Sequence, residues 1–323
     1  MMSFVPEFRD ILRDQEPLAG YTSYGLGGPA QWLACPRTID QVARLVGYCR
    51  GEGIPLYVLG LGANVLVSDE GVAGLVVRLN APGFRHVDWP RPGSANGSGR
   101  RRQATNGDKV TIVAGGGADM HRLVLEAVRR GLEGVEGLAG IPGTLGGIIR
   151  MNAGGQWGQI ADVVREVTVV DERGAMRHLP ASEVGFSYRN TRLGDAVVCQ
   201  AKLELRPGDP VALRERFMAI WEQKKRCQPL SEPSAGCVYK NPPGHRAGEL
   251  IDRAGLKGKA IGGARISQLH ANFIVTQEGA TAEDVFSLIG ETRRVVADRF
   301  GVELELEIKV WGRQRARSLE PAC

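Results

Sequence analysis

The sequence predicts an α+β protein of two or three domains. Its 323 residues are 43% hydrophobic, which is enough to build more than one apolar core. Amphipathic helical stretches and short apolar strand runs occur in mixed order, and the 44 glycines gather in loops after apolar runs. Glycine permits sharp turns and lets backbone N–H groups come close to a ligand. We therefore expect mixed domains that hold a ligand on glycine loops.

The predicted helices follow from apolar residues three and four positions apart. The first begins after Thr38, a favourable N-cap, and the last after Thr281, which forms a capping-box pattern with Asp284. Pro210 opens a helix, as prolines often do at the first helical position. The predicted helices cover residues 39–49, 120–128, 210–226, 247–254 and 281–300.

The predicted strands are apolar or alternating runs bounded by turn residues. The alternating run 302–311 would place Glu303, Glu305 and Glu307 on one face of a strand. The polar stretch 90–108 has little to bury and is expected to be a mobile loop. The remaining predicted strands cover residues 56–59, 74–79, 110–114, 163–170, 197–205 and 271–276.

Charge and cysteine content exclude several classes of protein. The net charge of +5 favours anionic partners, but the arginines at 100–102 have no aromatic neighbours, so no nucleic-acid partner is expected. The six cysteines include no Cys-x-x-Cys pair, and neither a metal site nor a disulfide framework is expected. No apolar stretch is long enough for membrane insertion, and residues 1–13 lack a signal-peptide pattern. A cytoplasmic protein is the expectation.

Three glycine loops indicate a ligand. Gly60, Gly62 and Asn64 follow a predicted strand, although a lone Gly-x-Gly is more often only a tight turn. The loops 139–147 and 151–155 add to it, and their glycines disfavour a helix across residues 138–155. Successive backbone N–H groups in such loops bind phosphate oxygens. Together the three loops predict a ligand that contains a diphosphate.

Further motifs follow these loops in order, and the whole set resembles the UDP-N-acetylenolpyruvoylglucosamine reductase (MurB) family over roughly residues 18–312. The turn before Cys237 resembles the second type of that family, most of whose members carry serine at the position of Cys237. The later motifs are Tyr188-Arg189, Ser234-Ala235-Gly236, Lys240-Asn241-Pro242, Ala254-Gly255-Leu256-Lys257-Gly258 and Glu307.

The resemblance implies non-covalently bound FAD, with NADPH as co-substrate. It also implies a two-part FAD-binding fold like that of vanillyl-alcohol-oxidase-type (PCMH-type) flavoproteins, followed by an α+β substrate-binding domain. The corresponding divisions are residues 1–80, 81–212 and 213–312, with a basic tail at 313–323. The implied reaction reduces the enolpyruvyl ether of UDP-N-acetylglucosamine to UDP-N-acetylmuramate, a peptidoglycan precursor.

The resemblance also assigns binding residues. Tyr188, Lys240, Asn241 and His270 would bind the nucleotide sugar, since they flank the proton-donor turn or the catalytic arginine and offer hydrogen-bond donors. The residues implied to bind FAD are Gly60, Gly62, Ala63, Asn64, Val65, Leu66, Gly140, Ile141, Pro142, Gly143, Thr144, Gly146, Gly147, Asn152, Ala153 and Gly154.

Three residues are implied to be catalytic, and each has a structural alternative. Arg189 would hold the substrate carboxylate in a planar fork, or else pair with a surface carboxylate. Cys237 would donate a proton, since a thiol has a reference pKa of about 8.5, or else be a small buried apolar residue. Glu307 would share the developing charge, or else lie on a solvated strand edge.

Two rival functions remain open from the sequence. A flavin-dependent sugar or alcohol oxidase could use the same cofactor fold, although such oxidases often tether flavin through a histidine that these glycine loops lack. A nucleotide-sensing protein without catalysis is the other, and the joint presence of Arg189, Cys237 and Glu307 disfavours it. No obligate protein partner is evident.

Overall fold

The computed structural model describes residues 6–90 and 109–312. The described chain forms two compact units, each assembled from separated stretches. The first unit contains residues 6–33, 61–76 and 224–312, and the second contains residues 34–60, 77–90 and 109–223. Nearly all of the predicted loop 90–108 and the predicted basic tail 313–323 lie outside the described residues, and the division into three domains stays a prediction.

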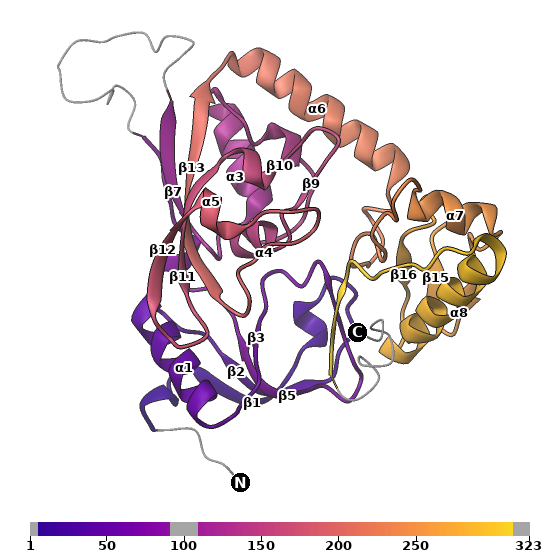
Figure 1. Ribbon diagram of the computed structural model, residues 1–323, viewed down its shortest axis with the longest axis horizontal. Helices are drawn as coiled ribbons and strands as arrows, with labels where there is room; N and C mark the ends of the chain where they lie inside the picture. Colours follow the sequence, from indigo (N-terminus) through magenta and orange to yellow (C-terminus); the bar gives the residue numbers. More distant parts are fainter. Residues whose placement is uncertain (1–5, 91–108, 313–323) are drawn as a thin grey trace. The chain divides into compact units, whose positions relative to one another are not determined.

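The second unit is built on an antiparallel sheet with strand order β12-β11-β13-β7-β6, and β8 also pairs with β13. Figure 1 shows α3, α4 and α5 beside this sheet. The strands are β6 (Val87–Asp88), β7 (Val110–Gly115), β8 (Leu132–Glu133), β11 (Val164–Val170), β12 (Met176–Pro180) and β13 (Val197–Pro207), with the short β3 (Leu56–Val58), β9 (Gly154–Gly155) and β10 (Gly158–Gln159) elsewhere in the unit.

Helices of the second unit bury their apolar stripes against this sheet. Met120, Leu123 and Val124 of α3 share one apolar core with Val167 and Leu203 of the sheet. The helices are α1 (Ile39–Gly51), α2 (Pro82–Arg85), α3 (Met120–Arg129), α4 (Leu145–Arg150), α5 (Ala181–Val184) and most of α6 (Pro210–Cys227), with short 3-10 turns at Glu136–Leu138 and Ile160–Asp162. The sheet and the helices α3, α4, α5 and α6 therefore form one folded core.

The first unit combines short strands with two helices around a second core. The strands β1 (Leu12–Pro17), β2 (Pro29–Ala34) and β5 (Val72–Val77) are neighbours in that order. Parallel pairing joins β4 (Val65–Val67) to β17 (Lys309–Trp311), the yellow strand of Figure 1. The other elements are β14 (Ala260–Ile261), β15 (Ala264–Ile266), β16 (Ile274–Thr276), α7 (Ala247–Arg253), α8 (Ala282–Phe300) and 3-10 turns at Pro6–Phe8 and Ala19–Tyr21.

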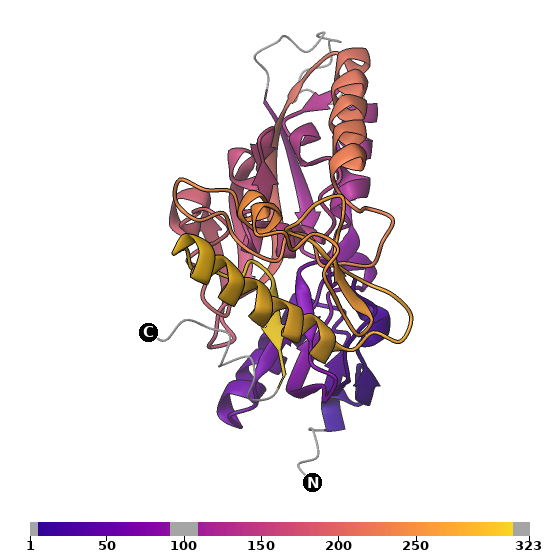
Figure 2. The ribbon, with the colours of Figure 1, turned by 90° about the vertical axis from the view of Figure 1, so that its right-hand side faces the viewer.

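Helix α8, which faces the viewer in yellow in Figure 2, supplies much of the apolar core of this unit. Its Leu288 and Ile289 are fully buried with Ile251 of α7. The carboxylate of Asp69 accepts hydrogen bonds from the backbone N–H groups of Ala282 and Glu283, at 2.9 and 3.1 Å. The turn after β4 is thereby fixed to the first turn of α8.

The five predicted helices are confirmed, together with two of their caps. Thr38 accepts a hydrogen bond from the N–H of Gln41, and Thr281 and Asp284 form the reciprocal capping box. The prediction that glycines exclude a helix from residues 138–155 is wrong, because α4 lies there. Its first turn is supported from outside the helix, since the N–H groups of Leu145 and Gly146 donate to other segments.

The predicted strand 302–311 is also wrong in extent, since only Lys309–Trp311 is a strand. The N–H groups of Glu307 and Ile308 both point at the carbonyl of Val238, at 2.8 and 3.5 Å, which breaks the regular alternation of a ladder. The predicted strand 271–276 shortens to Ile274–Thr276, because the N–H of Phe273 closes a turn onto the carbonyl of His270.

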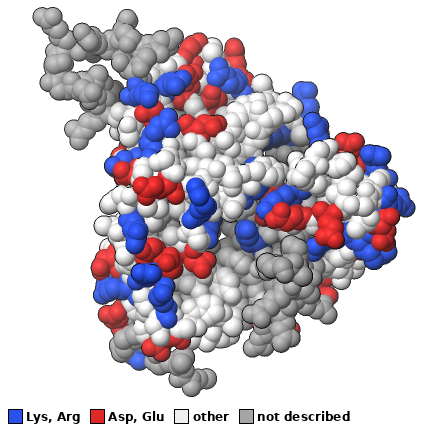
Figure 3. Space-filling view, in the orientation of Figure 1, with Lys and Arg blue, Asp and Glu red and all other residues white. Residues whose placement is uncertain are grey.

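Surface charge is mixed on the face shown in Figure 3, where Lys and Arg side chains lie among Asp and Glu side chains. The described residues also form ion pairs, such as Lys202 with Glu166 at 2.9 Å. The visible face therefore lacks an uninterrupted basic stripe of the kind that follows a phosphate backbone.

Candidate active site

Cys237 and Glu307 lie on neighbouring segments in the first unit. The N–H of Glu307 donates to the carbonyl of Val238 at 2.8 Å, so Glu307 is paired with the residue that follows Cys237. Cys237 itself forms an antiparallel bridge with Phe273 on its other side. Glu307 and Cys237 are both half-buried, whereas Glu303 and Glu305 are exposed. The structure therefore separates Glu307 from the two neighbouring acids with which the sequence grouped it.

The loop that begins at Gly60 reaches the same place through Asn64. The side-chain amide of Asn64 donates to the carbonyl of Glu307 at 3.2 Å, and the carbonyl of Asn64 accepts from Lys309 N–H at 2.9 Å. Gly236, which has a φ of +77°, lies so close that an added Cβ would be 3.9 Å from the carbonyl oxygen of Ala63. The predicted flavin loop and the predicted proton-donor turn are thus adjacent.

A buried asparagine that the sequence reasoning did not assign fixes the strand after Cys237. The side chain of Asn272, 3% exposed, accepts from the N–H of Tyr239 at 2.9 Å and donates to its carbonyl at 2.8 Å. The side chain of Asn272 thereby satisfies both backbone groups of Tyr239, as a residue on a neighbouring strand would. The signal in the sequence was a polar residue inside the apolar run 271–275.

The predicted substrate residue His270 has a fixed hydrogen-bonding role. Its Nδ1 accepts from the N–H of Asn272 at 3.2 Å, which requires the proton of the neutral ring to be on Nε2. Burial, with a smaller contribution from the positive charge of Lys257, lowers the pKa of His270 below its usual value. Its ring packs edge-on against Phe273 at 4.9 Å. His270 is therefore a neutral donor of one N–H.

Lys240 and Asn241 flank the same turn. The ammonium of Lys240 forms an ion pair with the carboxylate of Glu305. The backbone N–H of Lys240 donates to the backbone carbonyl of the same residue at 2.9 Å. The side-chain oxygen of Asn241 accepts from the N–H of Ala247 at 3.0 Å, at the start of α7. The structure brings both residues to the segment that carries Cys237.

In the second unit the glycine loops contact one another. A Cβ added to Gly60 would lie 2.5 Å from Oγ1 of Thr144, which is the N-cap residue of α4. Backbone N–H groups of Leu145 and Gly146 donate to the carbonyls of Ala118 and Gly116, both at 2.8 Å. The three consecutive glycines at 115–117, which begin at the end of β7, also belong to this cluster.

The other predicted cofactor residues extend these loops. Gly62, Gly140 and Gly143 have φ angles of +64°, +72° and +151°, in the region that glycine favours. Val65 and Leu66 lie in β4, Gly147 in the first turn of α4, Gly154 in β9, and Ile141, Pro142 and Ala153 in the connecting loops.

Tyr188 and Arg189 form the tip of a tight turn in the second unit. Ser187 and Asn190 exchange both backbone hydrogen bonds, at 3.0 and 3.2 Å. Arg189 has a φ of +54°, and its guanidinium lies 5.2 Å from the centre of the Tyr188 ring, which is 53% exposed. Asp195 is a nearby surface carboxylate of the kind that Arg189 could pair with in its alternative role, and it forms an ion pair with Arg150, at 3.9 Å. Arg189 is thus presented on a strained, local turn.

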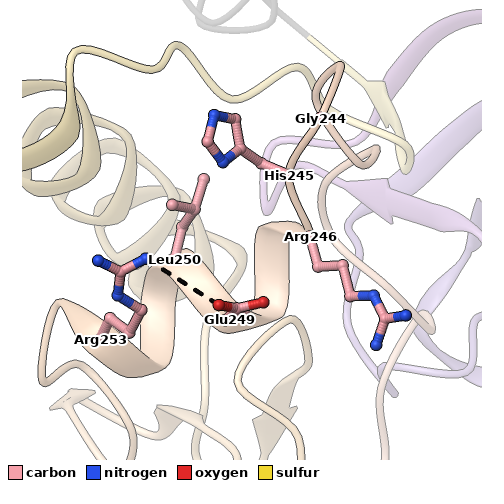
Figure 4. A pocket seen from close by; sticks show the side chains of 6 residues that line it. All are labelled: Gly244, His245, Arg246, Glu249, Leu250 and Arg253. Atoms are coloured by element: carbon pink, nitrogen blue, oxygen red, sulfur yellow. Dashed lines mark ion pairs between the residues drawn. The ribbon is translucent and has the colours of Figure 1, made fainter.

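A cavity of about 360 Å³ opens at α7, and no predicted site residue lines it. Figure 4 shows Arg246 pointing away from the other lining side chains, while Glu249 and Arg253 pair at 4.0 Å. Within residues 6–90 and 109–312, no group of three His, Cys, Asp or Glu side chains could hold a metal ion. The described helices include none that is both long and apolar enough to cross a membrane.

Comparison with known proteins defines first a class and then a family. The sequence profile of an FAD-binding domain matches residues 30–180, so the chain is a flavoprotein. The profile of the UDP-N-acetylenolpyruvoylglucosamine reductase C-terminal domain matches residues 228–311. Curated relatives at least 40% identical over 97% of this chain carry the same name, so the chain belongs to the UDP-N-acetylenolpyruvoylglucosamine reductase family.

Two bacterial relatives carry that name. Reductase 2 of Symbiobacterium thermophilum is 42% identical over 97% of this chain and 98% of its own length, and the Heliobacterium modesticaldum reductase is 40% identical over 97% and 94%. The crystal structure of MurB from Thermus caldophilus is similar with a TM-score of 0.76, at 36% identity over 93% of this chain and 100% of that one. The predicted family and α+β fold are confirmed.

The glycine cluster fits FAD as the cofactor of this family. A Cβ added to Gly60 would collide with Oγ1 of Thr144 at 2.5 Å, and one added to Gly146 would be crowded by the carbonyl of Gly116 at 3.0 Å. Loops packed this closely present backbone rather than side chains, which suits recognition of a diphosphate through N–H groups. The cofactor is FAD, with NADPH as the co-substrate, as the sequence predicted.

Proposed function

We propose that this protein uses NADPH to reduce UDP-N-acetylenolpyruvoylglucosamine to UDP-N-acetylmuramate. Family membership over nearly the whole chain supports the reaction. The structural observation that supports the proposal is the hydrogen-bonded arrangement of Asn64, Glu307 and Val238, which brings the segments of Cys237 and Glu307 beside the loop that is proposed to bind flavin. We also propose a cytoplasmic location, because NADPH and nucleotide sugars are cytoplasmic metabolites.

FAD supplies, when bound, the hydride chemistry that no side chain of the protein can perform. Addition of a hydride to the methylene carbon of the enolpyruvyl group moves the π electrons onto the α-carbon and the carboxylate. The Sγ–H bond of Cys237 then breaks, its proton bonds to the α-carbon, and the thiolate regains a proton from water. The balance is one hydride from NADPH and one proton from solvent for each product.

Arg189 and Glu307 are proposed to stabilise the charge that develops on the carboxylate. The guanidinium of Arg189 can donate two parallel hydrogen bonds to the two carboxylate oxygens. Glu307 is proposed to share this charge as a hydrogen-bonding acid, and its backbone is fixed by Val238 and Asn64. Donors that are held in place before the reaction stabilise such charge most effectively.

The substrate's nucleotide is proposed to contact Tyr188, Lys240, Asn241 and His270. His270 presents a neutral N–H, because its Nδ1 is occupied by the backbone of Asn272. Lys240 would have to exchange its pairing with Glu305 for a phosphate oxygen. A compact, strongly hydrated ammonium suits such an exchange.

An anaerobic absorbance titration tests the proposed function. NADPH should bleach the oxidised-flavin band near about 450 nm, and UDP-N-acetylenolpyruvoylglucosamine should restore it without oxygen. UDP-N-acetylglucosamine, which lacks the enolpyruvyl group, is the matched control and should restore nothing. Recovery only on admission of oxygen would favour the oxidase instead, and a protein that binds the nucleotide sugar without bleaching would favour the sensor.

A further inference from the structure

The turn that presents Arg189 needs support from outside itself. Only two residues, Tyr188 and Arg189, separate the paired residues Ser187 and Asn190. Arg189 is in the left-handed region at φ +54°, which a residue with a Cβ avoids unless its surroundings impose it. The turn is also on the surface, with Ser187, Tyr188 and Asn190 all exposed.

Asn152 provides that support from 35 residues away in the sequence. Its side chain, 3% exposed, donates from Nδ2 to the carbonyl of Ser187 at 2.9 Å. The same nitrogen donates to Oε1 of Gln159 at 3.1 Å, and Oδ1 accepts from the N–H of Ala161 at 3.4 Å. Both amide hydrogens are therefore used within the protein, and neither is left to donate to a cofactor.

A second tether joins the same two segments. Oγ1 of Thr191 donates to the carbonyl of Arg150 at 3.2 Å, and the guanidinium of Arg150 donates to the carbonyl of Ala196 at 3.2 Å. The chain from Arg150 to Asn152 thus holds the chain from Ser187 to Ala196 at three points. Asn152 is itself in the left-handed region, at φ +39°, which asparagine tolerates better than most residues.

We propose that Asn152, which the sequence placed among the cofactor residues, is a positioning residue for Arg189. Its buried amide fixes the Ser187 carbonyl and with it the orientation of the turn that carries the guanidinium. The inference rests on the proposed role of Arg189 in binding the substrate carboxylate. It predicts that loss of the amide slows the step that uses Arg189 and leaves the binding of FAD intact.

Two substitutions of Asn152 separate the effect of its side-chain amide from the effect of its left-handed backbone. Asn152→Asp keeps the size of the side chain but replaces Nδ2 with an oxygen that faces the Ser187 carbonyl. Asn152→Gly removes the side chain and still permits φ +39°. Gln159→Ala is the matched control, because it removes the hydrogen bond from Asn152 to Gln159 and leaves the one from Asn152 to the Ser187 carbonyl.

The experiment measures both half-reactions of the FAD-loaded enzyme by stopped-flow absorbance, together with its flavin content. For Asn152→Asp, reoxidation by UDP-N-acetylenolpyruvoylglucosamine should slow by about 30-fold, while flavin content and reduction by NADPH stay within about 2-fold. Gln159→Ala should keep reoxidation within about 3-fold of wild type. In Asn152→Gly, hydrogen–deuterium exchange should accelerate in peptides covering residues 185–192 and stay unchanged in those covering residues 139–147.

Each other outcome overturns a different statement. Loss of flavin from Asn152→Asp, or equal slowing of both half-reactions, would make Asn152 a cofactor ligand and end the proposal. Arg189→Ala, measured in parallel, tests the proposed function on which the inference rests. If Arg189→Ala abolishes reoxidation and Asn152→Asp does not slow it, only the inference fails. If Arg189→Ala leaves reoxidation intact, the role of Arg189 fails and the inference fails with it.

Discussion

The two units hold their candidate catalytic side chains by different means. In the first, Cys237 and Glu307 lie on segments joined by backbone hydrogen bonds, with Asn64 beside them. In the second, Arg189 lies at the tip of a two-residue turn supported by the amide of Asn152. The backbone hydrogen bond between Glu307 and Val238 does not need a particular side chain at either position. The Ser187 carbonyl, by contrast, loses a partner if the side chain of Asn152 changes, although Thr191 and Arg150 tether the following residues. Substitutions of supporting residues, as distinct from the candidate catalytic residues, should therefore affect catalysis most in the second unit.

Among the substitutions that compare the two supports, the largest effect is expected at Arg189, whose turn depends on the side chain of Asn152. Arg189→Ala should slow reoxidation by the enolpyruvyl substrate about 1,000-fold, because one preorganised donor to the developing charge is lost. Arg189→Lys keeps the charge but not the planar fork and should slow it about 100-fold. The urea midpoint should not change, since the turn is at the surface. If Arg189→Ala is reoxidised by the enolpyruvyl substrate at a rate within tenfold of wild type, Arg189 is not catalytic. The comparison between the supports of the two units then fails.

The next effect tests the backbone ladder of the first unit through stability rather than catalysis. Asn272→Leu leaves the N–H and carbonyl of Tyr239 without their side-chain partner and should lower the free energy of unfolding by about 3 kcal/mol. Urea titration followed by circular dichroism measures this change. The exposed Asn80 gives the matched control, and Asn80→Leu should change stability by less than about 0.5 kcal/mol. Equal effects would mean that Asn272 does not fix the ladder.

The smallest effect is the acid dependence of the first unit. Burial lowers the pKa of His270, so the folded state binds its proton more weakly than the unfolded state does. The stability contributed by the neutral ring is present above the ordinary histidine pKa of about 6.5 and is lost as the pH falls below it. His270→Gln, which keeps an acceptor but does not titrate, should reduce this loss.

The change for His270 is measured as the difference in unfolding free energy between pH 7 and pH 5. Because the ring is only half-buried, we expect wild type to lose under about 1 kcal/mol more than His270→Gln over this range. A larger loss in the variant than in wild type would contradict the direction of the shift.

The sequence predicted helices better than strands, for a physical reason. Helix ends depend on neighbours in sequence, so Thr38 and Thr281 indicated where α1 and α8 begin. Strand length depends on distant partners, and the alternation of residues 302–311 could not show that Val238 would receive two successive N–H groups. The helix α4 was missed because its first turn is stabilised by hydrogen bonds from the N–H groups of Leu145 and Gly146 to the carbonyls of Ala118 and Gly116, which lie elsewhere in the chain.

The resemblance names the candidate site residues, but it does not give their arrangement. It implies Cys237, Glu307 and Arg189, whose side chains suit a reaction that needs an acid and cationic support. The side chain of Asn64 bonds to the carbonyl of Glu307, 243 positions further along the chain, because β4 and β17 pair in parallel. The sequence alone does not show this pairing. The roles of Asn272 and Asn152 depend on burial, which the sequence does not specify for a single polar residue.

The most direct test of the central claim, that Cys237 donates the proton, compares the two half-reactions of Cys237→Ala with those of Cys237→Ser. We predict that reduction by NADPH stays within about 2-fold of wild type for both variants. Reoxidation by UDP-N-acetylenolpyruvoylglucosamine should fall by at least about 1,000-fold in Cys237→Ala, and only about 10-fold in Cys237→Ser, which keeps a donor on the same backbone. Equal loss of both half-reactions in Cys237→Ala, or unimpaired reoxidation, would contradict the assignment.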